Sequence, residues 1–394
     1  MTPVSPTSRL VTARRLERVG FSDIVQVRNK ILELREAGHE VFEFHGGEPY
    51  FETPADIKQA MFDAIRDNKT HYAPSSGIAP LRQAIVRKLA DRNDINVTAN
   101  DLLITNGGMQ ALYAAFQTVL DPGDECLVFS PYWTPIRDLI AGCEAHAVPL
   151  GTVASRQHGL RASLDAALTP RTRAVYFNSP NNPAGFVFSR AEAEIVAGFA
   201  RANDLVVIAD EAYEDLIYEG EHFSIASLPG MLERTITCFT FSKSYAMTGW
   251  RIGYAATPNE SFMSGMKKVV LYSTNGVSTA TQWAALKALD TPLSELRARR
   301  DEYRRRRDLL VDGMRSVGFS IDPPPGAFYA FPNASRISSD SRKAAAVMLE
   351  SARVSSVPGV VFGADGEGHL RMCFSASADV IRAAIESLKK NLPG

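Results

Sequence analysis

Lys243 and Arg251 are the first candidates for chemistry, because both cations lie beside an apolar run. They belong to the segment FTFSKSYAMTGWRIGY (239–254), in which one serine separates Lys243 from the end of the run and Arg251 comes eight residues after Lys243. An unpaired charge next to a buried element is costly, so each cation needs solvent or an anionic partner. A lysine here could form a Schiff base with an aldehyde, although a single lysine in such a turn is most often a solvated surface residue. Its importance therefore depends on its neighbours in space.

Five apolar runs in the middle of the chain each end in polar or flexible residues. The runs, with the residues that follow them, are DLLIT (101–105) before NGGMQ, ECLVFS (125–130) before PYW, RAVYF (173–177) before NSPNNPAG, LVVIA (205–209) before DEAY, and TITCFTF (235–241) before SKS. Helical patterns separate the runs, which predicts a mostly parallel sheet with helices on both faces. Ligands of such sheets bind outside the carboxyl ends of the strands. We therefore expect the residues after the five runs to meet at one edge.

Two of these strand ends suit a phosphate and a flat ring. Gly107 and Gly108 precede a predicted helix, whose free N–H groups and dipole would hold a phosphate. Alone, a glycine pair before a helix is more often only a tight turn. Arg251 could add a cation to the phosphate, and Trp133 offers a flat face to an aromatic ring.

The remaining strand ends suit the polar groups of such a ring. Asp210 ends a buried run and would be costly without a cationic partner such as a protonated ring nitrogen. Asn182 and Tyr213 could hydrogen-bond a phenolate oxygen, and Lys243 could bind the aldehyde. Phosphate, ring, pyridinium, phenolate and aldehyde together describe pyridoxal 5′-phosphate (PLP), with Lys243 and Asp210 as its electron-sink pair.

Motifs along nearly the whole chain resemble the class I/II aminotransferases of fold type I, close to the aspartate aminotransferase subgroup. In order, they are GGEPYFETP (46–54), HYAPSSGIAPLR (71–82), TNGGMQAL, DPGDECLVFSPYW, NSPNNPAG, DEAYEDL, SKSYAMTGWRIGY, PPPGAFYAF and HLRMCFS. The resemblance implies a PLP-dependent enzyme that moves the amino group of an L-amino acid to a 2-oxo acid by a ping-pong mechanism. It also implies a homodimer with shared active sites.

The resemblance assigns a role to each matching residue. Lys243, Asp210 and Tyr213 are the implied catalytic residues. The implied cofactor contacts are Gly107, Gly108, Met109, Trp133, Asn182, Asp210, Tyr213, Ser242, Lys243 and Arg251, with Tyr72 reaching the phosphate of the neighbouring subunit. The implied substrate contacts are Gly47, Trp133, Asn182 and Arg371, where Arg371 clamps the α-carboxylate in a bidentate manner that lysine performs poorly.

The order of the patterns also predicts two domains in an α/β fold. Residues 48–290 are expected to form a large PLP-binding domain around the mostly parallel sheet. Residues 1–47 and 291–394 are expected to form a smaller α+β domain from both ends of the chain. The helical pattern VQVRNKILELREAG and the strand-like VFEFH belong to its first part.

The composition limits the possible partners. The chain has 394 residues with Lys+Arg 43 and Asp+Glu 44, so a net charge of −1 provides no global field for nucleic acid or an anionic membrane. The basic cluster RRRR (304–307) has helical spacing with acids nearby and is expected to be a solvated helix face. The four cysteines form no metal or disulfide pattern, and no long apolar run is present, so we expect a cytoplasmic protein without a metal site.

Other functions on the same pattern remain open. The scaffold also carries lyases, cyclases and oxidases, so the fold does not decide the reaction. We do not expect a regulator domain, because the roughly 45 residues before GGEPY are too few for a DNA-binding module. Ser264 and Lys267 form the S-x-x-K pattern of some serine hydrolases, but no K-T-G or S-D-N accompanies them. A chance pattern on a helix face therefore explains these two residues better than a serine hydrolase site.

The residue after the glycine pair bears on the substrate. In aspartate-specific relatives a lysine commonly stands there and helps to hold the distal carboxylate, whereas this chain has Met109. A pocket of Met109, Phe328 and either Tyr132 or Tyr272 would favour apolar, aromatic or long side chains over aspartate. The alternative is an aspartate aminotransferase in which another residue, such as Arg28 or His45, holds the distal carboxylate.

Overall fold

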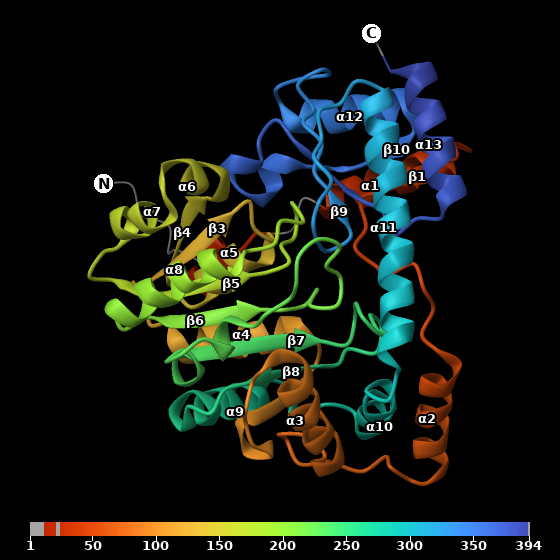
Figure 1. The fold of residues 1–394 in the computed structure, drawn as a ribbon. Helices are drawn as coiled ribbons and strands as arrows, with labels where there is room; N and C mark the ends of the chain where they lie inside the picture. The colour runs from red at the N-terminus through yellow and green to blue at the C-terminus, as the bar shows by residue number, and fades with distance from the viewer. Residues whose placement is uncertain (1–11, 21–23, 393–394) are drawn as a thin grey trace, which may run out of the picture.

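A seven-stranded sheet forms the centre of the larger part of the chain. The computed structural model describes residues 12–20 and 24–392 (Figure 1). The strands are β2 (Leu102–Thr105), β3 (Glu125–Ser130), β4 (His146–Gly151), β5 (Thr172–Asn178), β6 (Val206–Asp210), β7 (Thr235–Thr240) and β8 (Gly253–Ala256). Their order is β2-β8-β7-β6-β5-β3-β4, and β8 is antiparallel to both of its neighbours. The mostly parallel sheet predicted from the sequence is confirmed.

Helices cover both faces of this sheet, as the continuous apolar strands require. On one face lie α4 (Gly108–Val119), α5 (Pro135–Gly142) and α9 (Glu260–Thr274), whose buried side chains share one apolar cluster with the strands. On the other face lie α7 (Leu160–Ala167) and α8 (Arg190–Ala202), which share a second cluster. A third cluster joins the β2 edge to α2 (Ala55–Arg66), α3 (Ala79–Asn93) and α10 (Thr279–Ala288). The short helix α6 (Thr152–His158) follows β4.

The smaller domain contains segments from both ends of the chain. Its N-terminal part is α1 (Ile24–Glu36) and β1 (Phe42–Glu43). Its C-terminal part is the upper portion of α11 (Leu293–Ser316), with β9 (Tyr329–Ala330), α12 (Ser341–Ala352), β10 (Val354–Ser355), β11 (Val357–Pro358), β12 (Leu370–Cys373) and α13 (Ala378–Asn391) (Figure 1). Strand β1 pairs in parallel with β10, Phe42 opposite Val354. This pairing confirms a small α+β domain built from both termini, while the boundaries at 47/48 and 290/291 stay a prediction.

Two strands of the large sheet escaped the sequence analysis. Strand β4 is an edge strand that contains Pro149, which breaks an apolar run but is tolerated at a sheet edge. Strand β8 is the short segment GYAA, whose glycine and alanines give no strand-like pattern. Gly253 is required there, because a Cβ at this position would lie 2.5 Å from the carbonyl oxygen of Phe239.

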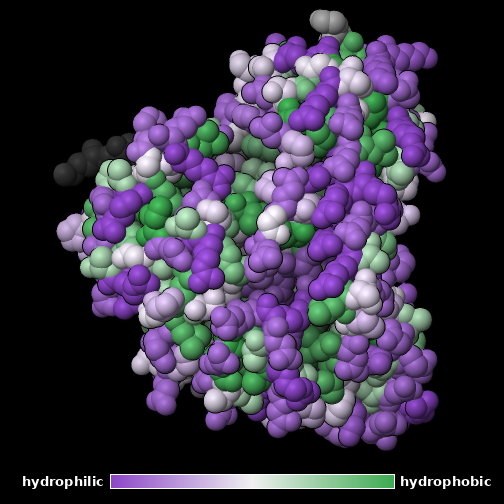
Figure 2. Space-filling model, viewed as in Figure 1, coloured by the Kyte–Doolittle hydropathy of each residue, from purple (hydrophilic) through white to green (hydrophobic). Residues whose placement is uncertain are grey.

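The basic cluster on α11 is only partly the solvated face that we expected. Figure 2 shows hydrophilic side chains over the outward side of this long helix. Arg306 and Arg307 are nevertheless buried: Arg306 lies 3.4 Å from the ring centroid of Tyr50, and Arg307 donates to the carbonyl of Pro324. Their long side chains pack inward while their charges pair with Glu302 and Glu219.

Two composition-based expectations can be compared with the described residues. All four cysteines are buried and unpaired, as expected of reduced core thiols. Within residues 12–20 and 24–392, we find no helix that is both long enough and apolar enough to cross a bilayer.

Candidate active site

A cavity of about 460 Å³ lies where the carboxyl edge of the large sheet faces the small domain. Most of the residues predicted from the sequence line it. These are Gly47, Gly108, Met109, Trp133, Asn182, Asp210, Tyr213, Ser242, Lys243, Arg251 and Arg371. Gly107 lies next to this lining, whereas Tyr72 does not line the cavity and is 93% exposed in the single chain. Segments from 47 to 371 therefore meet at one place.

Lys243 follows β7 and points its amine into this cavity. Its Nζ donates to the carbonyl oxygen of Gly47 at 2.6 Å and lies 5.4 Å from the ring centroid of Phe328. Burial lowers the pKa of Lys243 to about 8, with the attraction of Cys373 opposing the shift. An amine with a pKa near 8 is partly neutral at physiological pH, which is the form that attacks an aldehyde.

Asp210 ends β6 and is held by two donors. Its Oδ2 accepts from the Tyr176 hydroxyl at 2.7 Å, and its Oδ1 accepts from the backbone N–H of Ala212 at 3.1 Å. Burial raises the pKa of Asp210, and the hydrogen bond from Tyr176 is the largest effect opposing that rise. A buried carboxylate with so few partners is suited to a cationic ligand group.

The start of α4 forms a cradle for an anion. Gly107 is the N-cap residue with φ of +80°, and a Cβ there would lie 2.6 Å from Nη2 of Arg251. Arg251 donates to the carbonyls of Thr248 and Asn106, and its own φ is +53°. The hydroxyl of Ser242, which accepts from Thr240 at 2.9 Å, also lines the cavity here. N–H groups, a hydroxyl and a guanidinium therefore converge as a phosphate requires.

Arg371 lies on β12 on the small-domain side of the cavity. Its Nη1 donates to Oδ1 of Asn182 at 3.2 Å, and its Nη2 donates to the carbonyl of His45 at 2.7 Å. Its buried Nε has no hydrogen-bond partner within the part of the chain that the structure describes. The guanidinium of Arg371 lies 4.6 Å from the ring centroid of Tyr329, whose hydroxyl would lie 2.6 Å from a Cβ at Gly47. A guanidinium with an unused N–H can donate a charge-assisted hydrogen bond to a carboxylate.

Two residues that hold side chains of the site were missed by the sequence analysis, and some expected residues lie elsewhere. Tyr329 lines the cavity and hydrogen-bonds the hydroxyl of Tyr213 at 2.9 Å, whereas Tyr176 lies outside the lining and donates to Asp210. Both are aromatic residues within apolar runs and look like core. Phe328 and either Tyr132 or Tyr272 were expected to line the substrate pocket with Met109, but none of these three aromatic residues is among the lining residues. The exposed fraction of Tyr272 is 87% in the single chain.

The chain was compared with known proteins. Residues 39–388 match the family model of aminotransferase class I and II. The chain belongs to this aminotransferase family. It is 39% identical over 388 residues to a protein named aspartate/prephenate aminotransferase from Thermus thermophilus, covering 96% of this chain and 98% of that one. It is 35% identical to aromatic-amino-acid aminotransferase 2 from Thermococcus litoralis, covering 96% and 97%.

The structural comparison agrees with the sequence comparison. A solved structure of the Thermus thermophilus aspartate aminotransferase with maleate superposes with a TM-score of 0.91 at 39% identity, covering 96% of this chain and 99% of that one. The chain is thus a fold type I aminotransferase, and its cofactor is PLP. The buried Asp210, the anion cradle at Gly107 and the buried Lys243 amine all fit that group.

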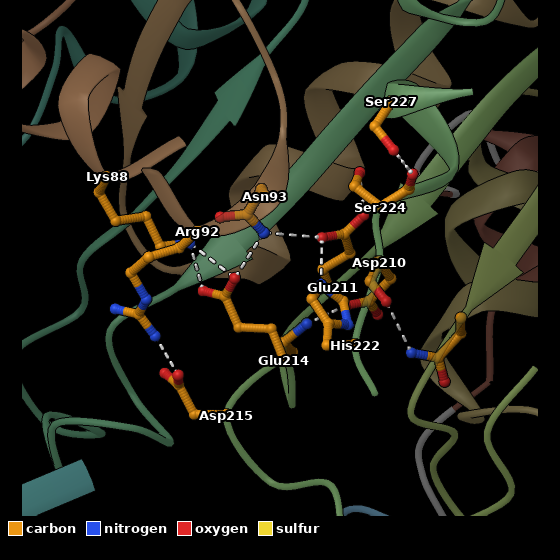
Figure 3. A network of polar contacts seen from close by, with 12 residues as sticks. Lys88, Arg92, Asn93, Asp210, Glu211, Glu214, Asp215, His222, Ser224 and Ser227 are labelled. Carbon is orange, nitrogen blue, oxygen red and sulfur yellow. Dashed lines mark hydrogen bonds and ion pairs between the residues drawn. The ribbon is translucent and has the colours of Figure 1, made fainter. Parts of the chain in front are cut away.

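A buried polar network lies behind the aminotransferase site (Figure 3). The Lys88 ammonium lies 2.6 Å from each carboxylate oxygen of Glu214, and Asn93 donates to Glu214 at 2.8 Å. The imidazole of His222 pairs with Glu211 at 2.9 Å. Glu211 and Glu214 flank the segment that carries Tyr213, so the network fixes this loop. Glu211, Glu214 and His222 have the geometry of a possible metal site. The ammonium of Lys88, however, already pairs with both carboxylate oxygens of Glu214, where a metal ion would bind.

We expect Lys88→Met to lower the free energy of unfolding by about 3–5 kcal/mol, because it leaves the buried Glu214 without its ammonium. Burial alone would raise the pKa of Glu214, but Lys88 and Arg92 lower it to about 2. The pair's stabilisation is therefore present above the unfolded pKa of Glu214 and is lost as the pH falls toward 2. Urea unfolding at several pH values measures both effects, and exposed Lys58→Met is the control. An equal, small change in both variants would contradict this account.

Proposed function

We propose that this aminotransferase takes L-amino acids with apolar, aromatic or long side chains as donors, in preference to aspartate. The observation that carries the proposal is Met109, which lines the cavity in the first turn of α4 with Leu112 one turn further on. These two side chains present an apolar wall, and position 109 is where aspartate-specific relatives commonly have a lysine. A thioether adapts to differently shaped apolar groups.

The charges along the cavity favour the same donors. Its lining cations are Lys243, Arg251 and Arg371, together with the titratable His45. The first three have other proposed tasks. Burial lowers the pKa of His45, opposed by the attraction of Glu43 and helped by the repulsion of Arg371, so the site disfavours a charged imidazole. Arg28 is exposed and is not among the lining residues. A distal carboxylate would thus lack a dedicated cation among the lining residues of the described chain.

Each residue at the sheet edge receives a task in this proposal. Bound PLP supplies the electron sink that makes an α-proton of the substrate acidic. The Lys243 amine would take that proton as a general base and return it as a general acid. Asp210 holds the proton of the ring nitrogen, and Trp133 stacks on the ring. Arg371 orients the α-carboxylate so that the α-proton faces Lys243.

The remaining contacts hold the phenolic oxygen and the phosphate of the cofactor and the carboxylate of the substrate. Asn182 and Tyr213 donate to the phenolic oxygen, and Gly47 lets the backbone approach the substrate carboxylate. The phosphate contacts are Ser242, Arg251 and the backbone of Gly107, Gly108 and Met109. We further propose a homodimer in which the exposed Tyr72 reaches the partner's phosphate, and a ping-pong exchange of an amino acid and a 2-oxo acid.

Met109→Lys is expected to shift kcat/KM toward acidic donors over apolar ones by about 10-fold or more, because it adds a charge-assisted hydrogen bond and removes an apolar wall. The measurement is kcat/KM for aspartate, glutamate, leucine and phenylalanine with 2-oxoglutarate as acceptor. Gln117→Lys, on the same helix but outside the cavity lining, is the matched control.

Two outcomes of this assay would overturn the proposal. One is an equal change for all four donors in Met109→Lys, which would mean that position 109 does not contact the donor side chain. The other is a wild-type enzyme that already prefers aspartate over leucine and phenylalanine. That result would make the chain an aspartate aminotransferase despite its apolar wall. A product other than the 2-oxo acid, or no need for an acceptor, would favour the lyase, cyclase or oxidase reactions of the scaffold.

A further inference from the structure

Tyr176 is a buried tyrosine outside the cavity lining whose hydroxyl contacts Asp210, a residue of the site. It lies in β5, is 1% exposed and donates to Oδ2 of Asp210 at 2.7 Å. Its strand pairs in parallel with β6, with Tyr176 opposite Ile208 and Asn178 opposite Asp210. Side chains two positions apart point to the same face of a strand. Tyr176 therefore reaches Asp210 diagonally across the sheet, and the phenyl ring of Phe116 from α4 packs against it.

The ionised form of Asp210 depends on the Tyr176 hydroxyl more than it would if the carboxylate lay at the surface. Its side chain accepts only two hydrogen bonds within the described chain, from Tyr176 and from the backbone N–H of Ala212. The other ionisable groups that act on it or are affected by it are Glu211, Tyr213, Cys238 and Lys243. Of these, only Lys243 carries a positive charge, and it is the residue that binds the cofactor in the proposed function. Without the phenol, the carboxylate would keep a single donor, and burial would favour its neutral form.

We propose that Tyr176 is a positioning residue, which keeps Asp210 ionised and oriented toward the ring nitrogen of the cofactor. The inference rests on the proposed function, in which Asp210 pairs with that nitrogen.

A phenol suits this task better than a cation would. A lysine or arginine at position 176 would neutralise Asp210 and compete with the pyridinium for it. A neutral O–H stabilises the carboxylate and leaves its negative charge available. Burial and the nearby Asp210 carboxylate raise the pKa of Tyr176 well above its usual value, so the phenol keeps its proton and donates at every working pH.

The test compares Tyr176→Phe with Tyr254→Phe in the holoenzyme. Tyr254 is a fitting control, because it is a buried tyrosine of the same sheet whose hydroxyl has no hydrogen-bond partner in the described chain. The measurements are kcat and KM for the best of the four donors, and the pH midpoint of the cofactor's absorbance change.

We expect Tyr176→Phe to lower kcat by about 10-fold or more, the usual effect of losing a hydrogen bond to a charged group. KM for the donor should change little, because Tyr176 does not contact the substrate cavity. The absorbance midpoint should rise, since a ring nitrogen without its proton withdraws fewer electrons from the titrating group. Tyr254→Phe should leave all three values at the wild-type level.

Asp210→Asn separates a failure of this inference from a failure of the proposed function. If Asp210→Asn lowers kcat strongly while Tyr176→Phe behaves like the wild type, only the role of Tyr176 is wrong. If Asp210→Asn also leaves kcat and the midpoint unchanged, the proposed role of Asp210 fails and the inference with it. Equal losses in Tyr176→Phe and Tyr254→Phe would indicate a general packing defect and would also overturn the inference.

A second substitution keeps the inference testable if Tyr176→Phe does not fold. Incorporating 3-fluorotyrosine in place of Tyr176 preserves the hydroxyl and makes it a stronger donor. The absorbance midpoint should then move down, opposite to the shift expected for Tyr176→Phe. An unchanged midpoint would contradict the proposed contact between the phenol and the working carboxylate.

Discussion

Lys243→Ala should lower kcat/KM for every donor by at least a factor of about 10² to 10⁴, the usual contribution of general acid–base catalysis alone. The loss should exceed this range, because the same substitution removes the proposed covalent partner of the cofactor. The variant should still bind some PLP, since the anion cradle at Gly107 and the guanidinium of Arg251 remain. Absorbance spectra of the purified variant measure the bound cofactor, and steady-state assays with the four donors measure the activity.

Lys267→Ala is the matched control for this experiment. Lys267 lies on α9 outside the cavity lining, where its amine donates to the carbonyl of Asn100 at 3.2 Å. It also belongs to the S-x-x-K pattern of Ser264 and Lys267, so unchanged activity would show that this pattern takes no part in transamination. Near-wild-type turnover in Lys243→Ala would refute the assignment of Lys243.

The second large effect is expected for Arg371→Ala, which should weaken all donors alike. The buried guanidinium contacts Asn182 and the backbone at His45, not the wall around Met109, so it is placed to bind the α-carboxylate that every donor carries. Removing one partner of such a buried, hydrogen-bonded charge pair costs about 2–5 kcal/mol. This corresponds to a loss of roughly 30-fold to several thousandfold in kcat/KM.

Arg371→Lys serves as the conservative comparison. It keeps the charge but not the planar fork, so its kcat/KM should lie between those of the wild type and Arg371→Ala. All three enzymes are assayed with aspartate, glutamate, leucine and phenylalanine. If Arg371→Ala reduces only the acidic donors, the guanidinium binds their distal carboxylate and the proposed clamp is wrong.

The sequence predicted the parallel sheet and the residues at its edge because each carries a local signal. An apolar run followed at once by Asp210, or after one serine by Lys243, places a polar group at the end of a buried strand. The partners of these residues carry no such signal. Tyr176 and Tyr329 lie inside apolar runs, where an aromatic residue is most often core. A tyrosine two residues before Asn178 in the same strand was the available hint, since it shares a face with the strand end.

Other errors came from segments whose structure depends on distant neighbours. The antiparallel β8 is too short and too rich in small residues to be recognised before its partners are known. The burial of Arg306 depends on Tyr50, far away in the sequence, which stacks on its guanidinium. Local composition cannot indicate such a contact.

The pairing of β1 with β10 has a consequence for how the enzyme is made on the ribosome. Phe44 donates its N–H to the hydroxyl of Ser355, a residue 311 positions later. At roughly 5–20 residues per second of synthesis, the nascent N-terminal segment waits on the order of 15 to 60 s for this partner. During that time, the large sheet can fold while the first strand stays unpaired and exposed to chaperones. The proposed carboxylate clamp, in which Arg371 donates to the carbonyl of His45, can form only after the ribosome has added Arg371.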